Sequence, residues 1–177
     1  MDKQALRKEI REKKRAMTEA EIVEKSEKLG RLLVASEAYQ KATTIYGYLP
    51  YNQEVRTVAM LRQALEDGKR VAVPKCYGDE MRFIYLDDLS KVEKGYCGIP
   101  EPIEDEPVAD DKTALVLMPG LAFTKEGLRM GYGGGFYDKF LASEPDHPTL
   151  ALCYDFQMVE TIPTEEYDIP VDTVIWA

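Results

Sequence analysis

The sequence predicts a single α/β domain over residues 1–177, built on a mostly parallel, doubly wound sheet flanked by helices, with a pair of helices at its N-terminal end. Two observations predict this class. Segments rich in β-branched and aromatic residues alternate with helical segments, and the run 113–118 is apolar throughout, as in a strand covered on both faces. With 177 residues, 45% of them apolar, the chain suits one core and leaves little room for two.

The first element is a helix over residues 2–17, which contain neither Gly nor Pro. Four bases follow one of its faces at spacings of four, four and three: Lys3, Arg7, Arg11 and Lys14. The pattern Thr18-Glu19-Ala20-Glu21 is a capping box, so a second helix is expected to start there and run to about Ala38. The side chains expected on its buried face are Ile22, Leu29, Leu32 and Leu33.

The later elements alternate between strands and helices. A helix is expected at 55–66, ended by Gly68, and another at about 136–143. The expected strands are 43–49, 70–74, 82–86, 113–118, 149–154 and 172–176. Residues 96–111, with three prolines and many acids, are expected to cross the surface.

Composition excludes several classes of function. The chain carries a formal charge of −9, which argues against a nucleic-acid partner or an anionic membrane surface. Residues 1–15 nevertheless carry seven bases against three acids, a net of +4, which leaves −13 for the remainder. Three cysteines without C-x-x-C spacing favour a reducing compartment over a disulfide scaffold or a zinc site, and no segment is apolar for long enough to span a bilayer. We therefore expect a cytoplasmic protein, either a monomer or a weak dimer.

The most informative segment is the glycine-rich run 131–135, which has four glycines in five positions before a predicted helix. Backbone amides without side chains, placed at a helix N-terminus, form an anion site that most often takes phosphate. Arg129 offers a guanidinium suited to bidentate phosphate contact. Asp138 offers a hard oxygen ligand for a magnesium ion that accompanies phosphates.

Two common phosphate motifs are excluded. No glycine is followed by Lys-Ser or Lys-Thr, as a P-loop requires, and Phe136 stands where a dinucleotide fingerprint needs its third glycine. The alternative to an anion site is a glycine-rich turn that merely ends a strand, although four clustered glycines are costly in chain entropy.

The chain resembles the 5-formyltetrahydrofolate cyclo-ligase family, also called methenyltetrahydrofolate synthetase. The central part of the likeness is Pro119-Gly120, Phe123, Gly127-Leu128-Arg129 and the run from Gly131 to Asp138. The likeness extends to both ends of the chain, through Lys3-Gln4-Ala5-Leu6-Arg7, Glu54, Pro74-Lys75, Ile162-Pro163 and Asp168-Ile169-Pro170-Val171-Asp172.

The resemblance implies an enzyme that uses ATP and Mg²⁺ to close 5-formyltetrahydrofolate into 5,10-methenyltetrahydrofolate, releasing ADP and phosphate. It implies Arg129 and Tyr137 as catalytic residues and Asp138 and Asp172 as metal ligands. The ATP-binding positions that it implies are Lys3, Gln4, Ala5, Leu6, Arg7, Arg129, Gly131, Tyr132, Gly133, Gly134, Gly135, Phe136 and Tyr137. The folate-binding positions that it implies are Leu49, Glu54, Tyr132, Gly133, Gly134, Gly135 and Phe136.

Other residues fit the resemblance loosely or not at all. Lys75 and Tyr77 match the folate site only loosely, and Phe136 stands where the family often carries a tyrosine. His147, the only histidine, is expected in a surface turn, and Cys153 in a buried strand.

Two alternatives to the cyclo-ligase stay open. One is a non-catalytic sensor that binds a nucleotide or folate on the same fold. The other is a phosphosugar isomerase, for which the sequence offers no persuasive acid–base residue near the glycine-rich loop.

Overall fold

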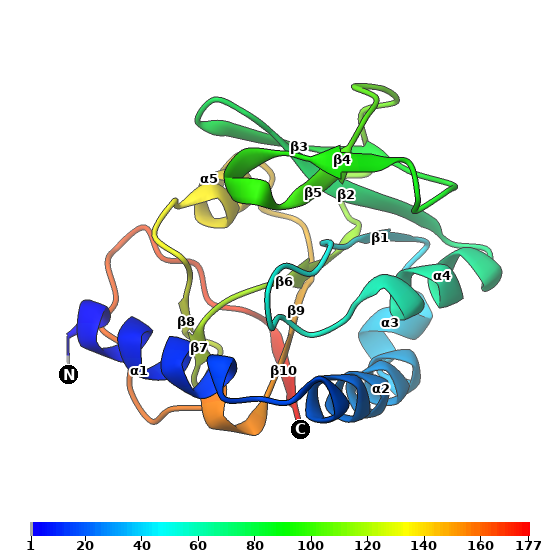
Figure 1. Cartoon of the computed structure of the whole chain (residues 1–177). Helices are drawn as coiled ribbons and strands as arrows, with labels where there is room; N and C mark the ends of the chain where they lie inside the picture. The colour runs from blue at the N-terminus through cyan, green and yellow to red at the C-terminus, as the bar shows by residue number, and fades with distance from the viewer. Residues whose placement is uncertain (1) are drawn as a thin grey trace.

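A six-stranded sheet forms the centre of the computed structural model, which describes residues 2–177 (Figure 1). Its spatial order is β10 (Thr173–Trp176), β9 (Thr149–Cys153), β6 (Leu115–Met118), β1 (Thr44–Tyr46), β2 (Arg70–Tyr77) and β3 (Glu80–Tyr85). All neighbours are parallel except β2 and β3, which form an antiparallel hairpin at one edge. The predicted α/β class with a mainly parallel sheet is confirmed.

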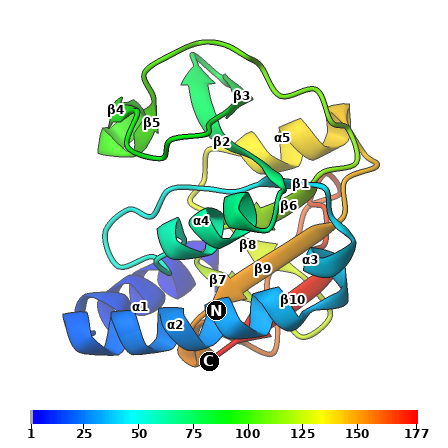
Figure 2. The ribbon, with the colours of Figure 1, turned by 90° about the vertical axis from the view of Figure 1, so that its right-hand side faces the viewer.

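Helices cover both faces of this sheet. On one face, α2 (Glu19–Ala35), α3 (Glu37–Lys41) and α4 (Val58–Glu66) pack on alternate strand residues such as Ile45 and Leu117. On the other face, α5 (Phe136–Ser143) packs on the intervening residues such as Tyr46 and Val116 (Figure 2). The alternation of inward side chains along each buried strand therefore supplies two cores.

Small elements lie outside the sheet. Helix α1 (Lys3–Arg15) packs Leu6 and Ile10 on a short ribbon made of β7 (Ala122–Phe123) and β8 (Arg129–Met130). A second ribbon pairs β4 (Val92–Lys94) with β5 (Pro100–Pro102) across the 3₁₀ turn η1 (Tyr96–Gly98). Another 3₁₀ turn, η2 (Asp155–Gln157), follows β9. Within residues 2–177, none of the helices has an apolar stretch long enough to cross a membrane.

The predicted second helix is interrupted. It ends at Ala35 because Ser36 adopts an extended conformation, and the Ser36 hydroxyl oxygen then accepts the backbone N–H of Tyr39 at 3.2 Å to cap α3. The expected burial of Leu32 is wrong, since this side chain is 41% exposed. Tyr39 is buried instead, and its hydroxyl donates to Asp67 at 2.5 Å.

Two strand predictions and the predicted surface crossing also change. The strand expected at 43–49 pairs only over Thr44–Tyr46, and Gly47 follows where an added Cβ would lie 2.5 Å from Leu61 Cδ2. The strand expected at 70–74 extends to Tyr77 because it pairs with β3. The crossing expected at 96–111 contains η1 and β5.

The expected surface position of His147 is wrong. Its imidazole is buried between Tyr46 and Phe140, with ring centroids 5.2 and 5.4 Å away. Its Nδ1 lies 2.8 Å from the carbonyl oxygen of Ala114, and its Nε2 lies 2.9 Å from Glu144 Oε1. Both partners fix the ring under α5, so His147 is a structural residue of the second core.

Candidate active site

A cleft of about 770 Å³ opens at the carboxyl ends of β1 and β6. The chain passes from β1 to β2 on one side and later returns to β6 on the other, so the strand order reverses between β1 and β6. Open parallel sheets bind ligands at this kind of point. Tyr48 and Leu49 after β1, and Pro119 after β6, line the floor of the cleft.

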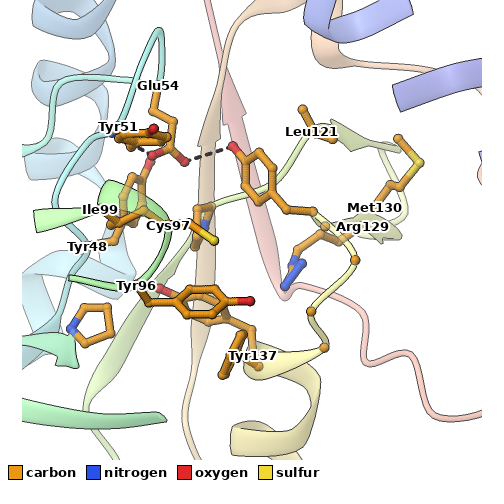
Figure 3. Close-up of a pocket in the computed structure, with 18 of the residues that line it drawn as sticks. Tyr48, Tyr51, Glu54, Tyr96, Cys97, Ile99, Leu121, Arg129, Met130 and Tyr137 are labelled. Atoms are coloured by element: carbon orange, nitrogen blue, oxygen red, sulfur yellow. Dashed lines mark hydrogen bonds between the residues drawn. The ribbon is translucent and has the colours of Figure 1, made fainter. Parts of the chain in front are cut away.

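Four segments far apart in the sequence form the walls. They are the basic face of α1, the turn 48–54, the ribbon 96–101 around η1, and the loop 129–138 that contains the glycine-rich run. Figure 3 shows side chains from three of them, including Glu54, Tyr96 and Arg129, arranged around one space. The structure therefore brings together the basic head, the glycine-rich loop and Glu54.

Helix α1 presents only part of its predicted binding segment to the cleft. Asp2 caps the helix by accepting the backbone N–H of Ala5 at 2.7 Å. Leu6 lies on the buried face of the helix. Lys3 and Arg7, which are one helical turn apart, lie on the face that lines the cleft. The Nε–H of Arg7 donates to the carbonyl oxygen of Gly131 at 3.2 Å, which attaches the helix to the loop.

Two of the predicted ATP-binding residues in this segment, Gln4 and Ala5, are exposed, and neither lines the cleft. Leu6 is buried against the β7–β8 ribbon instead. Among these five positions, contact through side chains is therefore open only to Lys3 and Arg7.

The glycine-rich loop has the conformation that its composition predicts. Gly133 and Gly135 have φ values of +107° and +69°, which favour glycine. A Cβ on Gly131 would lie 2.6 Å from Arg129 Nη1, and one on Gly134 would lie 2.9 Å from the Phe136 ring. Helix α5 then begins at Phe136, so backbone amides and a helix N-terminus meet beside the cleft.

Arg129 is the cation at the base of this loop. Its Nε is buried and has no hydrogen-bond partner among the described residues, although the guanidinium lies 5.5 Å from the Tyr137 ring. Burial lowers the pKa of Arg129, and the negative charge of Asp138 raises it. A buried donor without a partner is costly, so this position is suited to an anionic group that enters the cleft.

Glu54 is held at the opposite wall by two hydrogen bonds. The backbone N–H of Tyr51 donates to Oε1 at 2.8 Å, and the Tyr132 hydroxyl donates to Oε2 at 2.9 Å (Figure 3). Burial raises the pKa of Glu54, while Lys14 and these two hydrogen bonds lower it. The carboxylate can accept from paired N–H donors of a flat heterocycle.

Aromatic side chains line the space between Glu54 and Arg129. Tyr48 is buried at the floor, and Tyr96 packs edge-on against Phe136 with ring centroids 5.4 Å apart. Burial raises the pKa of Tyr137 well above its ordinary value, which keeps its phenol protonated and able to donate. This chemistry suits stacking on a planar ring.

The structure separates the two aspartates expected to hold magnesium. Asp138 lines the cleft and accepts the backbone N–H of Ile169 at 3.2 Å. Asp172 does not line it, and its Oδ2 accepts both the backbone N–H of Thr149 at 2.9 Å and the Thr149 hydroxyl at 3.3 Å. These bonds join the amino ends of β9 and β10, so Asp172 has a structural role in this arrangement. No group of three or more metal-ligating side chains occurs in residues 2–177.

Two loosely matched residues also lie elsewhere. Lys75 is buried, with its ammonium group 3.1 Å from Asp105 and 3.0 Å from the carbonyl oxygen of Ile103. The Tyr77 hydroxyl donates to the same Asp105 at 2.6 Å. Neither side chain lines the cleft, and both fasten the segment after β5 to β2.

Several lining residues were not predicted. Lys14 lies on the same basic face as Lys3 and Arg7, and this spacing is the sequence signal that indicates its place in the cleft. The ribbon residues Tyr96 and Cys97 gave no sequence signal, because they reach the cleft only through the pairing of β4 with β5.

Known proteins share this chain's sequence and fold. The model of the 5-formyltetrahydrofolate cyclo-ligase family matches residues 1–177. A 5-formyltetrahydrofolate cyclo-ligase of Mus musculus is 28% identical and covers 98% of this chain and 93% of its own length. One from Escherichia coli strain K12 is also 28% identical, with 94% of this chain and 95% of that protein covered.

Two solved structures give the same result. A 5,10-methenyltetrahydrofolate synthetase of Aquifex aeolicus superposes with a TM-score of 0.86 at 30% identity, covering 99% of this chain and 90% of that one. One from Mycoplasma pneumoniae gives a TM-score of 0.79 at 26% identity, covering 99% and 98%. The resemblance and the predicted enzyme class are confirmed: this chain belongs to the 5-formyltetrahydrofolate cyclo-ligase family.

Proposed function

We propose that this protein uses ATP and Mg²⁺ to cyclise 5-formyltetrahydrofolate to 5,10-methenyltetrahydrofolate, releasing ADP and phosphate. The observation that carries the proposal is the buried, unpartnered Nε of Arg129 beside a glycine-rich loop, opposite a carboxylate held by Tyr132. One end of the cleft is suited to a polyphosphate and the other to a heterocycle with paired N–H donors. The proposal includes a cytoplasmic enzyme, monomeric or weakly dimeric, with small-molecule partners and neither nucleic-acid nor membrane partners.

The chemistry requires activation of a poor leaving group. A formamide oxygen cannot leave as hydroxide when N10 attacks the formyl carbon. The formyl oxygen therefore attacks the γ-phosphorus of ATP, ADP leaves, and an imidate phosphate forms. The N10 lone pair then attacks the formyl carbon, phosphate departs, and the N10 proton is lost as the methenyl bridge forms. The protein contributes position and charge, with no covalent bond of its own.

The residues of the loop and of α1 suit the phosphate chain. The Arg129 guanidinium stabilises charge on the transferring group, and Lys3 and Arg7 neutralise the remaining phosphates from the facing helix. The loop amides at 131–135 donate to phosphate oxygens without side-chain obstruction. Tyr137, kept protonated by burial, donates to an oxygen of the reacting group.

The opposite wall suits the folate. Glu54 accepts hydrogen bonds from the amino group and ring N–H of the pterin. Leu49 and the aromatic ring of Phe136 pack on its faces, and the Tyr132 backbone lies between the two substrates.

The cleft fits Mg²⁺ delivered with ATP rather than a resident metal. Mg²⁺ is typically held by one or two carboxylates together with substrate phosphates and water. Asp138 is the lining carboxylate next to Arg129, and it would hold the ion there. The ion would supply charge neutralisation to the phosphates.

The experiment is a spectroscopic assay of methenyl formation, paired with an assay of ADP. With 5-formyltetrahydrofolate, ATP and Mg²⁺ present, both products are expected in equal amounts, and omission of ATP abolishes both. Arg129→Ala is expected to lower turnover by at least about 100-fold, the usual cost of a lost donor to the transition state, while the thermal midpoint stays close to the wild-type value. Binding of folate or nucleotide without any ATP consumption contradicts the proposal and favours a sensor.

A further inference from the structure

Lys14 is an unusual lysine, because it is only 5% exposed although none of the other lysines of α1 is buried. Burial of an ammonium group is costly unless a partner compensates for it. Its Nζ donates to the Tyr132 hydroxyl oxygen at 3.5 Å and lies 5.7 Å from the centroid of that ring. The same hydroxyl donates to Glu54 Oε2 at 2.9 Å. Lys14, Tyr132 and Glu54 therefore form a relay, a chain of two hydrogen bonds that runs from α1 through the glycine-rich loop to the wall of the cleft that contains Glu54.

Lys14 also lies away from the proposed phosphate site. Eleven residues separate it from Lys3, which is about 16 Å along a helix at 1.5 Å per residue. Both side chains line the same cleft, so α1 spans its length. Lys14 therefore acts on the end that holds Glu54, whereas Lys3 and Arg7 act on the end that holds the loop.

Within the part of the chain that the structure describes, Lys14 is the cation whose charge lowers the pKa of Glu54. Burial disfavours the charged form of this carboxylate, and Lys14 offers the largest opposing effect, ahead of the hydrogen bonds from Tyr132 and Tyr51. The remaining groups that face Glu54 are phenols: Tyr48 after β1, Tyr137 on α5 and Tyr154 after β9. Arg11 faces Lys14 and Tyr132 from α1, and Arg129 faces Tyr132 from β8.

We propose that Lys14 is a positioning residue for the folate: through the Tyr132 hydroxyl it keeps the Glu54 carboxylate charged and fixed as the acceptor for the pterin N–H groups. The inference rests on the proposed function, since it takes the heterocycle at Glu54 to be the pterin. Lys14 needs no contact with either substrate. Its removal is expected to act on folate binding and leave the phosphate end of the cleft unchanged.

The test measures 5-formyltetrahydrofolate binding without ATP, and KM and kcat with ATP, between pH 5 and pH 9. Lys14→Met keeps the unbranched apolar stem and removes the charge. Lys13→Met is the matched control, because Lys13 is the adjacent residue on the same helix and its exposed side chain pairs with Glu9 of that helix, at 3.2 Å. Lys14→Arg retains a charge and is expected to recover part of the loss.

Lys14→Met is expected to raise the folate Kd and KM about tenfold at pH 7, the size of one weakened charge-assisted hydrogen bond to the pterin, with little change in kcat or in the KM for ATP. The acid limb of folate binding moves to higher pH, because loss of the cation raises the pKa of Glu54 further. Lys13→Met behaves as the wild type. Tyr132→Phe, which removes the bridging hydroxyl from an exposed ring, has the same effect, and adding it to Lys14→Met costs less than the product of the two single losses.

The role of Lys14 is refuted if Lys14→Met has the folate affinity and pH profile of Lys13→Met, or if Tyr132→Phe does. Tyr132→Phe tests the relay even if Lys14→Met fails to fold. A wild-type protein that binds folate but forms no methenyl product contradicts the proposed function alone, and the binding comparison still tests Lys14. A wild-type protein that binds no folate overturns both.

Discussion

Gly127→Ala tests whether the glycine before Arg129 is required by the fold rather than by a ligand. Gly127 has a φ of +92°, and an added Cβ would overlap with the carbonyl oxygen of Val171. Its own carbonyl oxygen accepts the backbone N–H of Val171 at 2.7 Å, which holds the β7–β8 ribbon to the chain entering β10.

The expected cost follows from three contributions. A left-handed conformation costs an alanine about 1–2 kcal/mol. Relief of an overlap with backbone atoms costs about 1–3 kcal/mol, as in overpacked cores. Loss or distortion of the hydrogen bond to Val171 adds about 1 kcal/mol. The free energy of unfolding is expected to fall by about 3–6 kcal/mol, which lowers the thermal midpoint by roughly 6–24 °C for a chain of this size.

Urea unfolding followed by circular dichroism measures this loss, with Gly68→Ala as the control. Gly68 has a similar φ of +83° but no atom within 4 Å of an added Cβ, so Gly68→Ala carries only the conformational cost of about 1–2 kcal/mol. The difference between the two variants isolates the contact with Val171. If both unfold at the same urea concentration with equal slopes, the reasoning about that contact is refuted.

Three further predictions follow from the same contacts. Gly131→Ala is expected to displace the Arg129 guanidinium, because the added Cβ would lie 2.6 Å from Nη1. The KM for ATP is expected to rise while the urea midpoint stays unchanged. A KM for ATP equal to that of the wild type contradicts this prediction. Ile10→Ala removes a side chain of α1 that is 1% exposed and packs on the β7–β8 ribbon. The free energy of unfolding in urea is expected to fall by about 2–4 kcal/mol, and ATP binding is expected to weaken. Lys13→Met, on the exposed face of the same helix, is expected to change neither. Glu54→Gln is expected to abolish folate binding and to remove one pH-dependent contribution to stability: burial raises the pKa of Glu54 in the folded state, so the carboxyl stabilises the fold below its ordinary pKa of 4.5 and loses that contribution as the pH rises through the folded pKa. Urea midpoints of this variant and the wild type at pH 4 and pH 7 check the sign: relative to the variant, the wild type is expected to be more stable at pH 4 than at pH 7, and the opposite change refutes it.

Local patterns predicted the parts of the fold that depend on neighbours in the sequence. The capping box at Thr18 forms as expected. The Thr18 backbone N–H donates to Glu21 Oε1 at 3.1 Å, and the Glu21 backbone N–H donates to the Thr18 hydroxyl oxygen at 3.1 Å. The glycine-rich loop leads into α5 as its composition indicates. Both depend on interactions within a few residues, so a single sequence contains the necessary information.

Contacts between distant segments were not predictable in the same way. The exposure of Leu32 depends on how α2 rotates over the sheet, and the burial of His147 depends on packing against Tyr46 from β1. The relation of Lys14 to Glu54 passes through a tyrosine 118 residues further along the chain. No local pattern specifies these, because each depends on the final arrangement of separate elements.

Helix α1 packs on the β7–β8 ribbon, which lies more than a hundred residues later in the sequence. This packing affects the order in which the chain folds during synthesis and the way in which ligand binding can be detected. The apolar stripe of Leu6 and Ile10 leaves the ribosome well before Leu121 and Met130, the residues that cover it. Helix α1 therefore packs only after the residues of the ribbon have been made, and its docking has to close a loop of more than a hundred residues. A ligand that contacts both Arg7 and Arg129 holds α1 against the β7–β8 ribbon. Amide exchange and proteolysis in residues 3–15 should therefore slow when ATP is bound, which makes the N-terminal helix the natural reporter of an occupied cleft.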